Sequence, residues 1–410
     1  MPVVTFRRKI KGLLRRKEGS NRGGPAINHR DPVLDWLRVT AFGLLILYHS
    51  GMAWSGWHWH LNSTEDIVWL REAMRFVNRW RMPLLFVVSG GAIVLALGLR
   101  TPGTFALDRL RRLLLPLAFG MIVLVPPQVY AERHYSGQFA GSFLEWLPQA
   151  FVGTYPSGNL SWHHLWFLAY VLVLSFVLLP YFLWARTTQG RAVQGVIARL
   201  GGAFGLHWLM ALPLAASIFW LVPLSHNVNG LIGDWHGLFY NGVLLVYGGF
   251  IFGTPAMLGV VNRQRWLSLA IGITTYATVY VEFFDGAVGA LVLPADRPAF
   301  ALLSAVNTIA WLFTAIGFAN RYLTMRPRVL SYATEAVYPF YMIHQTVTVI
   351  AVYWLLTLDV PPVEGFVIAA VATFAITWVI YAWLIQPFAI VRPLFGLKTT
   401  RPVLLAEPVR

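Results

Sequence analysis

The chain has 410 residues, of which 57% are hydrophobic and 12% are charged, and its mean hydropathy is +0.60. Because a soluble domain is about 25% charged, this composition excludes an ordinary soluble protein and predicts a helical membrane protein with many spans. The formal charge of +15 fits the Lys and Arg excess of cytoplasmic loops, so we do not expect nucleic-acid binding. The absence of cysteine excludes disulfides, thiolate metal sites and a cysteine nucleophile.

Residues 1–32 form a basic N-terminal segment. The run R-R-K-I-K-G-L-L-R-R-K begins at Arg7 and lacks the apolar core and the small-residue cleavage site of a signal peptide. We expect a cytoplasmic tail that is disordered or lies on membrane lipids, and we favour this interpretation over a specific binding role.

Residues 33–56 are the first predicted span, yet they contain Asp35, Arg38 and His49. In a helix Arg38 and His49 are close to three turns apart, so they share a face and are separated by about 16 Å along the axis. In a structural interpretation, Arg38 pairs with Asp35 near the head groups, and His49 hydrogen-bonds to another helix. In a functional interpretation, ionisable residues inside a span mark a site. The helix by itself leaves both open.

Hydropathy predicts an all-α bundle of ten spans. They lie at residues 33–56, 82–99, 113–130, 164–184, 207–223, 237–254, 266–283, 299–319, 330–355 and 364–387. Outside the spans, Lys and Arg sort into alternate segments, with 25 on one side and 6 on the other. We therefore expect one transmembrane domain at residues 33–387, with cytoplasmic tails at 1–32 and 388–410. Arg38 then lies near the inner face and His49 toward the outer leaflet.

Arg109 and Arg112 precede the third span on its cytoplasmic side. They are three residues apart, so they share a helix face, whereas Arg111 points elsewhere. Paired guanidinium groups suit phosphate oxygens, although a cluster that only sets membrane topology is the competing interpretation.

Residues 57–81 form an amphipathic outer segment. Ser63 with Asp66 resembles a capping box, so we expect an interfacial helix there. The preceding run W-S-G-W-H-W-H fits either an aromatic belt or a wall that stacks on sugars. His58 and His60 have too little support as metal ligands, and we predict no metal site.

Further ionisable residues lie in or beside the predicted spans, and most of the imidazoles gather toward the outer half of the bundle. His163 and His164 lead into the fourth span, Asp234 precedes the sixth, and Glu335 lies with His344 in the ninth. Motifs of other enzyme classes are missing, because the sequence has no Walker loop, no G-x-S-x-G, no H-E-x-x-H and no close pair of carboxylates.

Several stretches resemble the acyltransferase-3 family of integral membrane acyltransferases. The Arg and His of its first span, with ten residues between them, match Arg38 and His49, and its R-x-x-R pattern matches Arg109 and Arg112. M-P-L-L-F-V-V-S-G, H-L-W-F-L and Y-P-F-Y-M-I-H-Q also resemble family landmarks, so the likeness covers residues 30–390. The H-H-L-W-F-L version is most similar to a branch that modifies periplasmic glucans.

This resemblance implies acyl transfer from cytoplasmic acyl-CoA to a hydroxyl of a carbohydrate outside the bacterial inner membrane. Arg109 and Arg112 would hold the phosphates of the donor, and Arg38 would bind the donor or fix the first span. His49 suits the general base that a sugar hydroxyl needs. The candidates for orienting the base or the substrate are Asp35, His163, His164, Asp234 and Glu335.

A transporter or flippase of a lipid-linked or free solute is the alternative from another functional class. Ionisable residues inside spans fit it, but the sequence has no internal repeat of the kind that many transporters show. The residues leave open whether the acyl group is acetyl or succinyl.

Overall fold

The chain divides into two compact units, Met1–Asp31 and Pro32–Arg410, and the computed structural model describes residues 31–284 and 297–400. The predicted N-terminal tail and the end of the C-terminal tail fall outside the described residues. Within those residues the secondary structure is helical, apart from an isolated bridge between Thr154 and Leu160, which confirms the predicted all-α class.

The helices of the second unit differ widely in length. They are α2 (Pro32–Gly51), α3 (Val68–Asn78), α4 (Arg81–Gly98), α5 (Pro102–Arg109), α6 (Leu115–Phe119), α7 (Pro126–Tyr135), α8 (Phe143–Trp146), α9 (Trp166–Val177), α10 (Leu179–Ala185), α11 (Thr188–Phe204), α12 (Ala211–Ala216), α13 (Trp235–Gly253), α14 (Pro255–Phe284), α15 (Pro298–Tyr322), α16 (Arg328–Thr357) and α17 (Pro362–Ile380). Short 3₁₀ and π turns connect or extend several of them.

Five helical segments among the described residues are long and apolar enough to cross a membrane. They are Val68–Gly98, Pro102–Tyr135, Pro298–Tyr322, Arg328–Thr357 and Pro362–Ile385. Three further pairs of helices meet the same condition together but bend between their halves by 57°, 117° and 97°. The structure thus supports five to eight spans, and it does not confirm the predicted ten or the cytoplasmic position of the termini.

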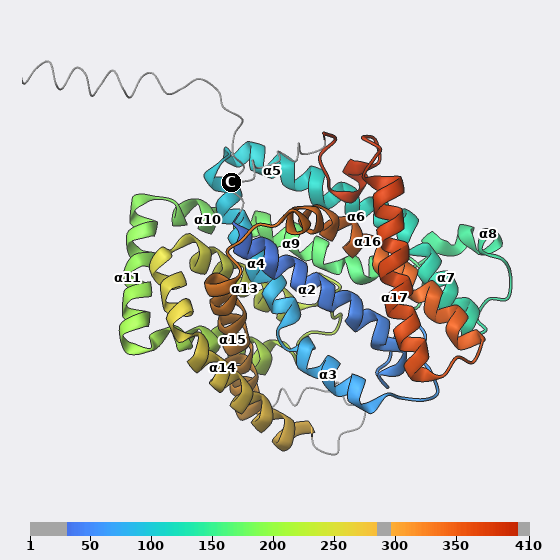
Figure 1. The fold of residues 1–410 in the computed structure, drawn as a ribbon, viewed down its shortest axis with the longest axis horizontal. Helices are drawn as coiled ribbons and strands as arrows, with labels where there is room; N and C mark the ends of the chain where they lie inside the picture. Colours follow the sequence, from blue (N-terminus) through green and yellow to red (C-terminus); the bar gives the residue numbers. More distant parts are fainter. Residues whose placement is uncertain (1–30, 285–296, 401–410) are drawn as a thin grey trace, which may run out of the picture. The chain divides into compact units, whose positions relative to one another are not determined.

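The helix of the first predicted span is shorter than expected. α2 ends at Gly51, a 3₁₀ turn follows at Met52–Trp54, and Gly56 leaves it with a positive φ of 73°. α2 is not among the helices apolar enough to span, because its ionisable and polar residues lower its hydropathy. It nevertheless packs against α4, α16 and α17, and it lies between α4 and α17 in Figure 1.

The capping box predicted in the first outer segment is wrong. α3 begins at Val68 without a side-chain cap, the Ser63 hydroxyl accepts from the Glu65 amide, and Asp66 pairs with Arg71 at 3.3 Å. Arg71 is buried, because this ion pair and the packing of α3 against α2 and α4 cover it.

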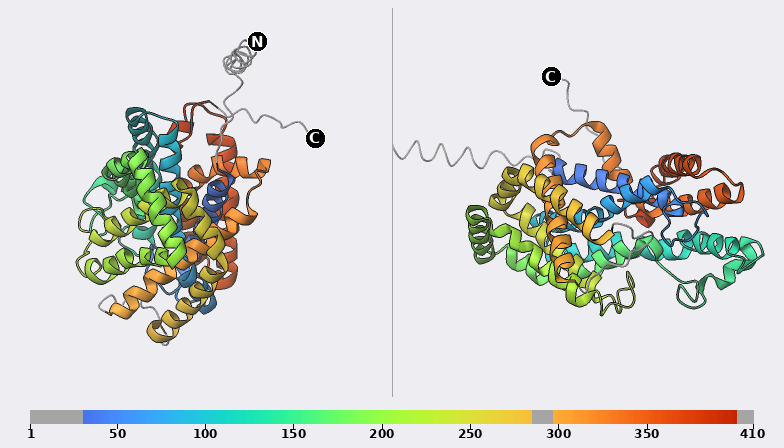
Figure 2. Two further views of the ribbon diagram at one scale, coloured as in Figure 1. Left: turned by 90° about the vertical axis from the view of Figure 1, so that its left-hand side faces the viewer. Right: turned by 90° about the horizontal axis from the view of Figure 1, so that it is seen from below.

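Small residues bring α4 and α13 close together. A Cβ at Gly90 would collide with the Leu245 carbonyl, and one at Gly248 would collide with the Val87 carbonyl. Glycines at these positions therefore permit the close approach of the two helices. In the right-hand view of Figure 2, α2 and α4, both in blue, run through the same part of the unit.

Candidate active site

Two imidazoles from distant parts of the sequence meet between α2 and α16. His49 lies in the last turn of α2 and is half-buried, whereas His344 lies inside α16 and is 0% exposed. His49 Nδ1 is 2.8 Å from His344 Nε2, and the two rings are nearly parallel. Tertiary packing thus gives His49 a second imidazole as its direct partner.

Backbone contacts fix the tautomers of this pair when both rings are neutral. His344 Nδ1 is 2.7 Å from the Tyr341 carbonyl oxygen, which only accepts, so Nδ1 carries the proton. His344 Nε2 is then an acceptor, and the bond between the rings requires His49 Nδ1 to donate. His49 Nε2 is left with a lone pair, which is the form that a general base needs.

His49 borders a cavity of about 190 Å³. Its wall combines side chains from α2, α3, α4, α9 and α16 with the turns before α9 and α13. The lining residues are Leu45, Tyr48, His49, Asn78, Arg81, Met82, His164, Trp166, Asn229 and Tyr341. Aromatic and polar side chains around one base form a site that can orient a small substrate.

His164 is the other predicted imidazole in this cavity wall. Its Nε2 donates to the Met342 carbonyl at 3.0 Å, and its ring meets the His344 ring edge to face. Tyr341 donates to the His164 carbonyl at 2.6 Å and so fixes the backbone of the same turn. The structure therefore brings His49, His164 and His344 together, as required if His164 orients the base.

His163 lies in a separate polar cluster. Its ring stacks on His60 at a centroid distance of 4.5 Å, and His60 Nδ1 donates to Glu132 at 2.6 Å. Gln345 donates to the other nitrogen of His60, and Tyr155 donates to Glu132. Burial, with Glu132 nearby, raises the pKa of Tyr155 to about 12, so its hydroxyl stays protonated. Because Gln345 follows His344, α16 connects this cluster to the His49 site.

Asp234 caps a helix. Its carboxylate accepts from the Gly237 amide at 2.8 Å at the start of α13, and also from the Tyr170 hydroxyl and the Asn229 amide. The predicted role in orienting substrate is thus limited to an indirect one, because Asn229 lines the cavity and Asp234 holds its backbone.

Glu335 lies near the N-terminal end of α16 and is bound to Arg392. It accepts from Arg392 Nη2 at 2.7 Å, and it lies nine residues before His344, which corresponds to roughly 13 Å along a helix. This position does not bring it to His49. The structure therefore does not support the expected role of Glu335 in orienting the base, because its carboxylate is bound to the Arg392 guanidinium.

Asp35 holds the start of α2. Its carboxylate is 3.5 Å from Arg38 and 3.1 Å from Arg326, so it joins α2 to the segment before α16. This matches the ion pair expected in the structural interpretation of Arg38. Asp35 lies far along α2 from His49, so the contacts assign it to packing.

The predicted inner arginines lie near one another. Arg109 ends α5 and stands over the Phe105 ring at 4.9 Å, and Arg112 follows in the next turn. Both are half-buried, and Arg112 and Arg38 are close enough to act electrostatically on Arg109. A group of like charges of this kind is suited to an anion with several charged oxygens.

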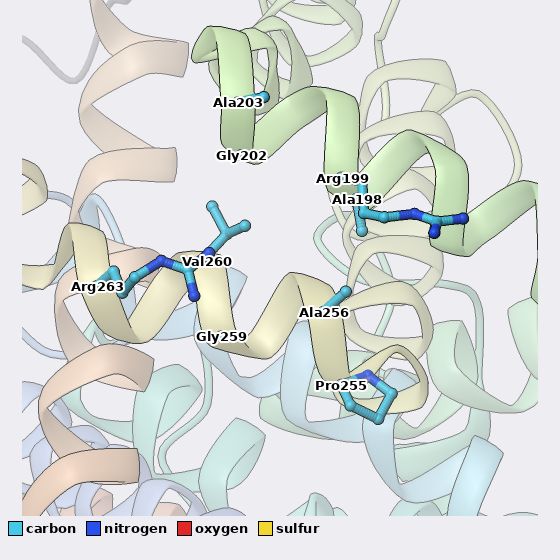
Figure 3. Close-up of a pocket in the computed structure, with 9 residues that line it drawn as sticks. All are labelled: Ala198, Arg199, Gly202, Ala203, Pro255, Ala256, Gly259, Val260 and Arg263. Atoms are coloured by element: carbon cyan, nitrogen blue, oxygen red, sulfur yellow. The ribbon is translucent and has the colours of Figure 1, made fainter.

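A larger cavity of about 400 Å³ lies between α11 and α14 (Figure 3). Small residues and two arginines, Arg199 and Arg263, line it. The described lining includes no His, Asp or Glu, so this cavity offers no general base. Nor does any group of three His, Asp or Glu side chains in the described ranges have the arrangement of a metal site.

The acyltransferase-3 family model, described as an acyltransferase domain, matches residues 31–382. The chain therefore belongs to this family of membrane acyltransferases. Glucans biosynthesis protein C of Shigella dysenteriae serotype 1 is 29% identical over 155 residues, and the same protein of Escherichia coli K12 is 28% identical. These alignments cover 37% of this chain and 38% of each relative. No solved structure is significantly similar to the chain.

Three features of the site were missed in the sequence. The first is the pairing of His49 with His344, which are 295 residues apart. The second is the pair of His60 and Glu132, for which the sequence carries no spacing signal. The third is Arg81, which directly precedes the M-P-L-L-F stretch and could have been noticed as an ionisable residue at the edge of a span.

Proposed function

We propose that this protein is an O-acyltransferase that moves an acetyl or succinyl group from cytoplasmic acyl-CoA to a hydroxyl of a carbohydrate outside the bacterial inner membrane. The observation that carries this proposal is the His49–His344 pair, in which His49 keeps a free Nε2 beside a cavity. Family membership supports the reaction class, and the glucans biosynthesis relatives support a glucan-like acceptor.

In the proposed reaction, His49 Nε2 removes the proton of the acceptor hydroxyl as its oxygen attacks the thioester carbonyl carbon. The carbon–sulfur bond then breaks, and the CoA thiolate takes the proton from His49. A positioned base of this kind contributes about 10²–10⁴-fold to the rate. His344 orients the base and stabilises its protonated form.

The donor is proposed to enter from the side of Arg109 and Arg112, whose guanidinium groups suit its phosphates. Arg38 lies beside them, roughly 16 Å along α2 from His49. The acyl-bearing arm has to cover this separation to reach the base. Arg38 accordingly binds the donor or holds α2 in place. The proposed reaction needs no metal.

The test is acyl transfer by the purified protein in lipid nanodiscs. Labelled acetyl-CoA and succinyl-CoA are supplied with a linear glucan, and the product is identified by mass spectrometry. We expect a glycan ester and free CoA with one donor. Solute uptake into vesicles without any ester would instead support the transporter alternative.

Membrane orientation can be tested separately, because the chain has no native cysteine. A cysteine placed at Ser142, an exposed position, should react with an impermeant reagent outside intact cells. One placed at Thr324, exposed before α16, should react only after permeabilisation. The reverse pattern would place the His49 end of the bundle in the cytoplasm and contradict the proposed acceptor.

A further inference from the structure

Arg81, the first residue of α4, carries a buried guanidinium without an acidic partner among the described residues. It is 3% exposed, and its Nε and Nη1 have no hydrogen-bond partner there. Its Cζ stands 3.9 Å from the centroid of the Tyr48 ring. A buried cation is costly unless it is paired, and one aromatic face compensates only part of that cost.

The missing counter-charge has a place to bind. Arg81 lines the same cavity as His49, and the described residues around that cavity contain no carboxylate. An anion that satisfies Arg81 must therefore arrive with the substrate or form during the reaction. Arg81 also acts electrostatically on both His49 and His344, so it lies close to the base.

We propose that Arg81 is a catalytic residue that binds the oxyanion formed on the acyl carbonyl during transfer. This inference rests on the proposed acyltransferase function. When the acceptor oxygen bonds to the carbonyl carbon, the π electrons of the C=O bond move to its oxygen, and the hydroxyl proton goes to His49. When the oxyanion re-forms the C=O bond, the carbon–sulfur bond breaks and the thiolate leaves with that proton.

The geometry of Arg81 suits this role because its donors are fixed before the substrate arrives. Tyr48 immediately precedes His49 in α2, so one helical turn carries both the platform for the guanidinium and the base. Donors that are held in place, with water excluded, stabilise charge in the transition state without reorganisation. The two nitrogens without a partner, Nε and Nη1, carry three N–H groups, and the lone pairs of an oxyanion can accept from more than one of them.

The experiment measures kcat and KM of Arg81→Gln and Arg81→Lys with acetyl-CoA and with succinyl-CoA. Loss of an oxyanion donor lowers kcat by about 10²–10³-fold. We expect this fall with every donor that the wild type uses, with KM little changed, and a smaller fall for Arg81→Lys, which keeps the charge. Arg321→Gln is the control, because Arg321 also stands over an aromatic ring but does not line the cavity.

A second variant separates catalysis from folding. Arg81→Ala leaves space for a guanidinium ion, so added guanidinium at non-denaturing concentration should restore turnover. An equal concentration of sodium should not. Rescue requires folded protein, and it is not expected for His49→Gln in the same preparation.

Three results would overturn the proposal. The first is a wild-type kcat in Arg81→Gln, and the second is a change in KM without a change in kcat. The third is a fall in kcat with succinyl-CoA alone, because Arg81 would then bind the free carboxylate of that donor. Failure of the proposed function looks different, because the wild type would then form no ester or His49→Gln would keep its turnover.

Discussion

Arg81 and Arg392 are buried to nearly the same degree, at 3% and 2% exposure, but their surroundings differ. Arg392 lies in the turn Arg392–Phe395 after α17, and all three of its nitrogens are used. They donate to the Lys398 carbonyl at 2.6 Å, the Gln386 carbonyl at 3.2 Å and Glu335 at 2.7 Å. Arg81 has an aromatic ring and a cavity in place of these acceptors.

The partners of a buried arginine indicate whether it stabilises the fold or forms part of a binding site. Arg392 connects the segment after α17 to α16, and its charge is neutralised there. Each of its three nitrogens already donates to an acceptor of the protein, and Glu335 supplies the counter-charge. Arg81 has unused donors, so an incoming anion gains contacts and breaks none. Burial alone does not distinguish the two cases, whereas the presence of a carboxylate and of backbone acceptors around the guanidinium does.

The largest effect should come from His49, the base beside Arg81. His49→Gln should lower acyl transfer by at least about 10²-fold, mainly in kcat, because glutamine cannot accept the proton. Folding should survive, since one interhelical hydrogen bond contributes about 0.6–2 kcal/mol. Turnover and thermal unfolding are measured together in nanodiscs.

His207→Gln is the matched control for this measurement. His207 is a buried imidazole that donates to the Gly201 backbone carbonyl, and it does not line the cavity. Near-wild-type turnover in His49→Gln would make His49 a packing residue. His164 would then be the next base to test.

The second prediction concerns Glu335, the partner of Arg392. Glu335→Gln should lower stability by about 3–5 kcal/mol, because it leaves a buried guanidinium without its counter-charge. The Glu335→Gln protein that remains folded should keep the wild-type kcat. Replacing both residues with apolar ones, as Arg392→Met with Glu335→Leu, should recover much of the stability. A fall in kcat at unchanged stability would instead restore Glu335 as a residue that orients the base.

The third prediction tests the inner arginines. Arg109→Ala with Arg112→Ala should raise KM for acyl-CoA at least about tenfold, because a hydrogen bond to a charged group is worth about 1.5–3 kcal/mol. kcat should change little. Arg111→Ala is the control, since Arg111 is exposed in the same turn. If the double variant keeps the wild-type KM, Arg109 and Arg112 only set membrane topology.

The smallest effect should appear at the surface, in the capping box of α8. The Ser142 backbone amide and hydroxyl donate to Glu145, and these bonds lower the pKa of Glu145 from its usual 4.5. A lowered pKa in the folded state means that the bonds contribute fully above pH 4.5 and are lost as the pH falls through the folded-state value. Amide exchange of α8 should therefore quicken below pH 4.5.

Glu145→Gln should remove this pH dependence and leave turnover unchanged. Persistence of the acid-induced change in Glu145→Gln would assign it to another group. Because Glu145 is exposed to solvent, this cap contrasts with the buried pair of Arg392 and Glu335, where the same kind of charged contact is far more costly to break.

The sequence by itself determined the class of the protein and the family. Composition and hydropathy require buried helices in a membrane, because backbone polar groups must be satisfied internally there. Local spacing also predicted that Arg38 and His49 share one face of their helix. The Asp234 cap could have been found in the same way, since an Asp directly before a helix is a local signal.

The tertiary structure alone decided which ionisable groups pair and which do not. His49 meets His344, Glu335 meets Arg392, and Arg81 meets no acid among the described residues. These outcomes depend on how distant helices pack, so no spacing within one helix reveals them. The candidate base was therefore visible in the sequence, whereas its tautomer, its cavity and the unpaired guanidinium beside it follow only from the packing of α2, α4 and α16.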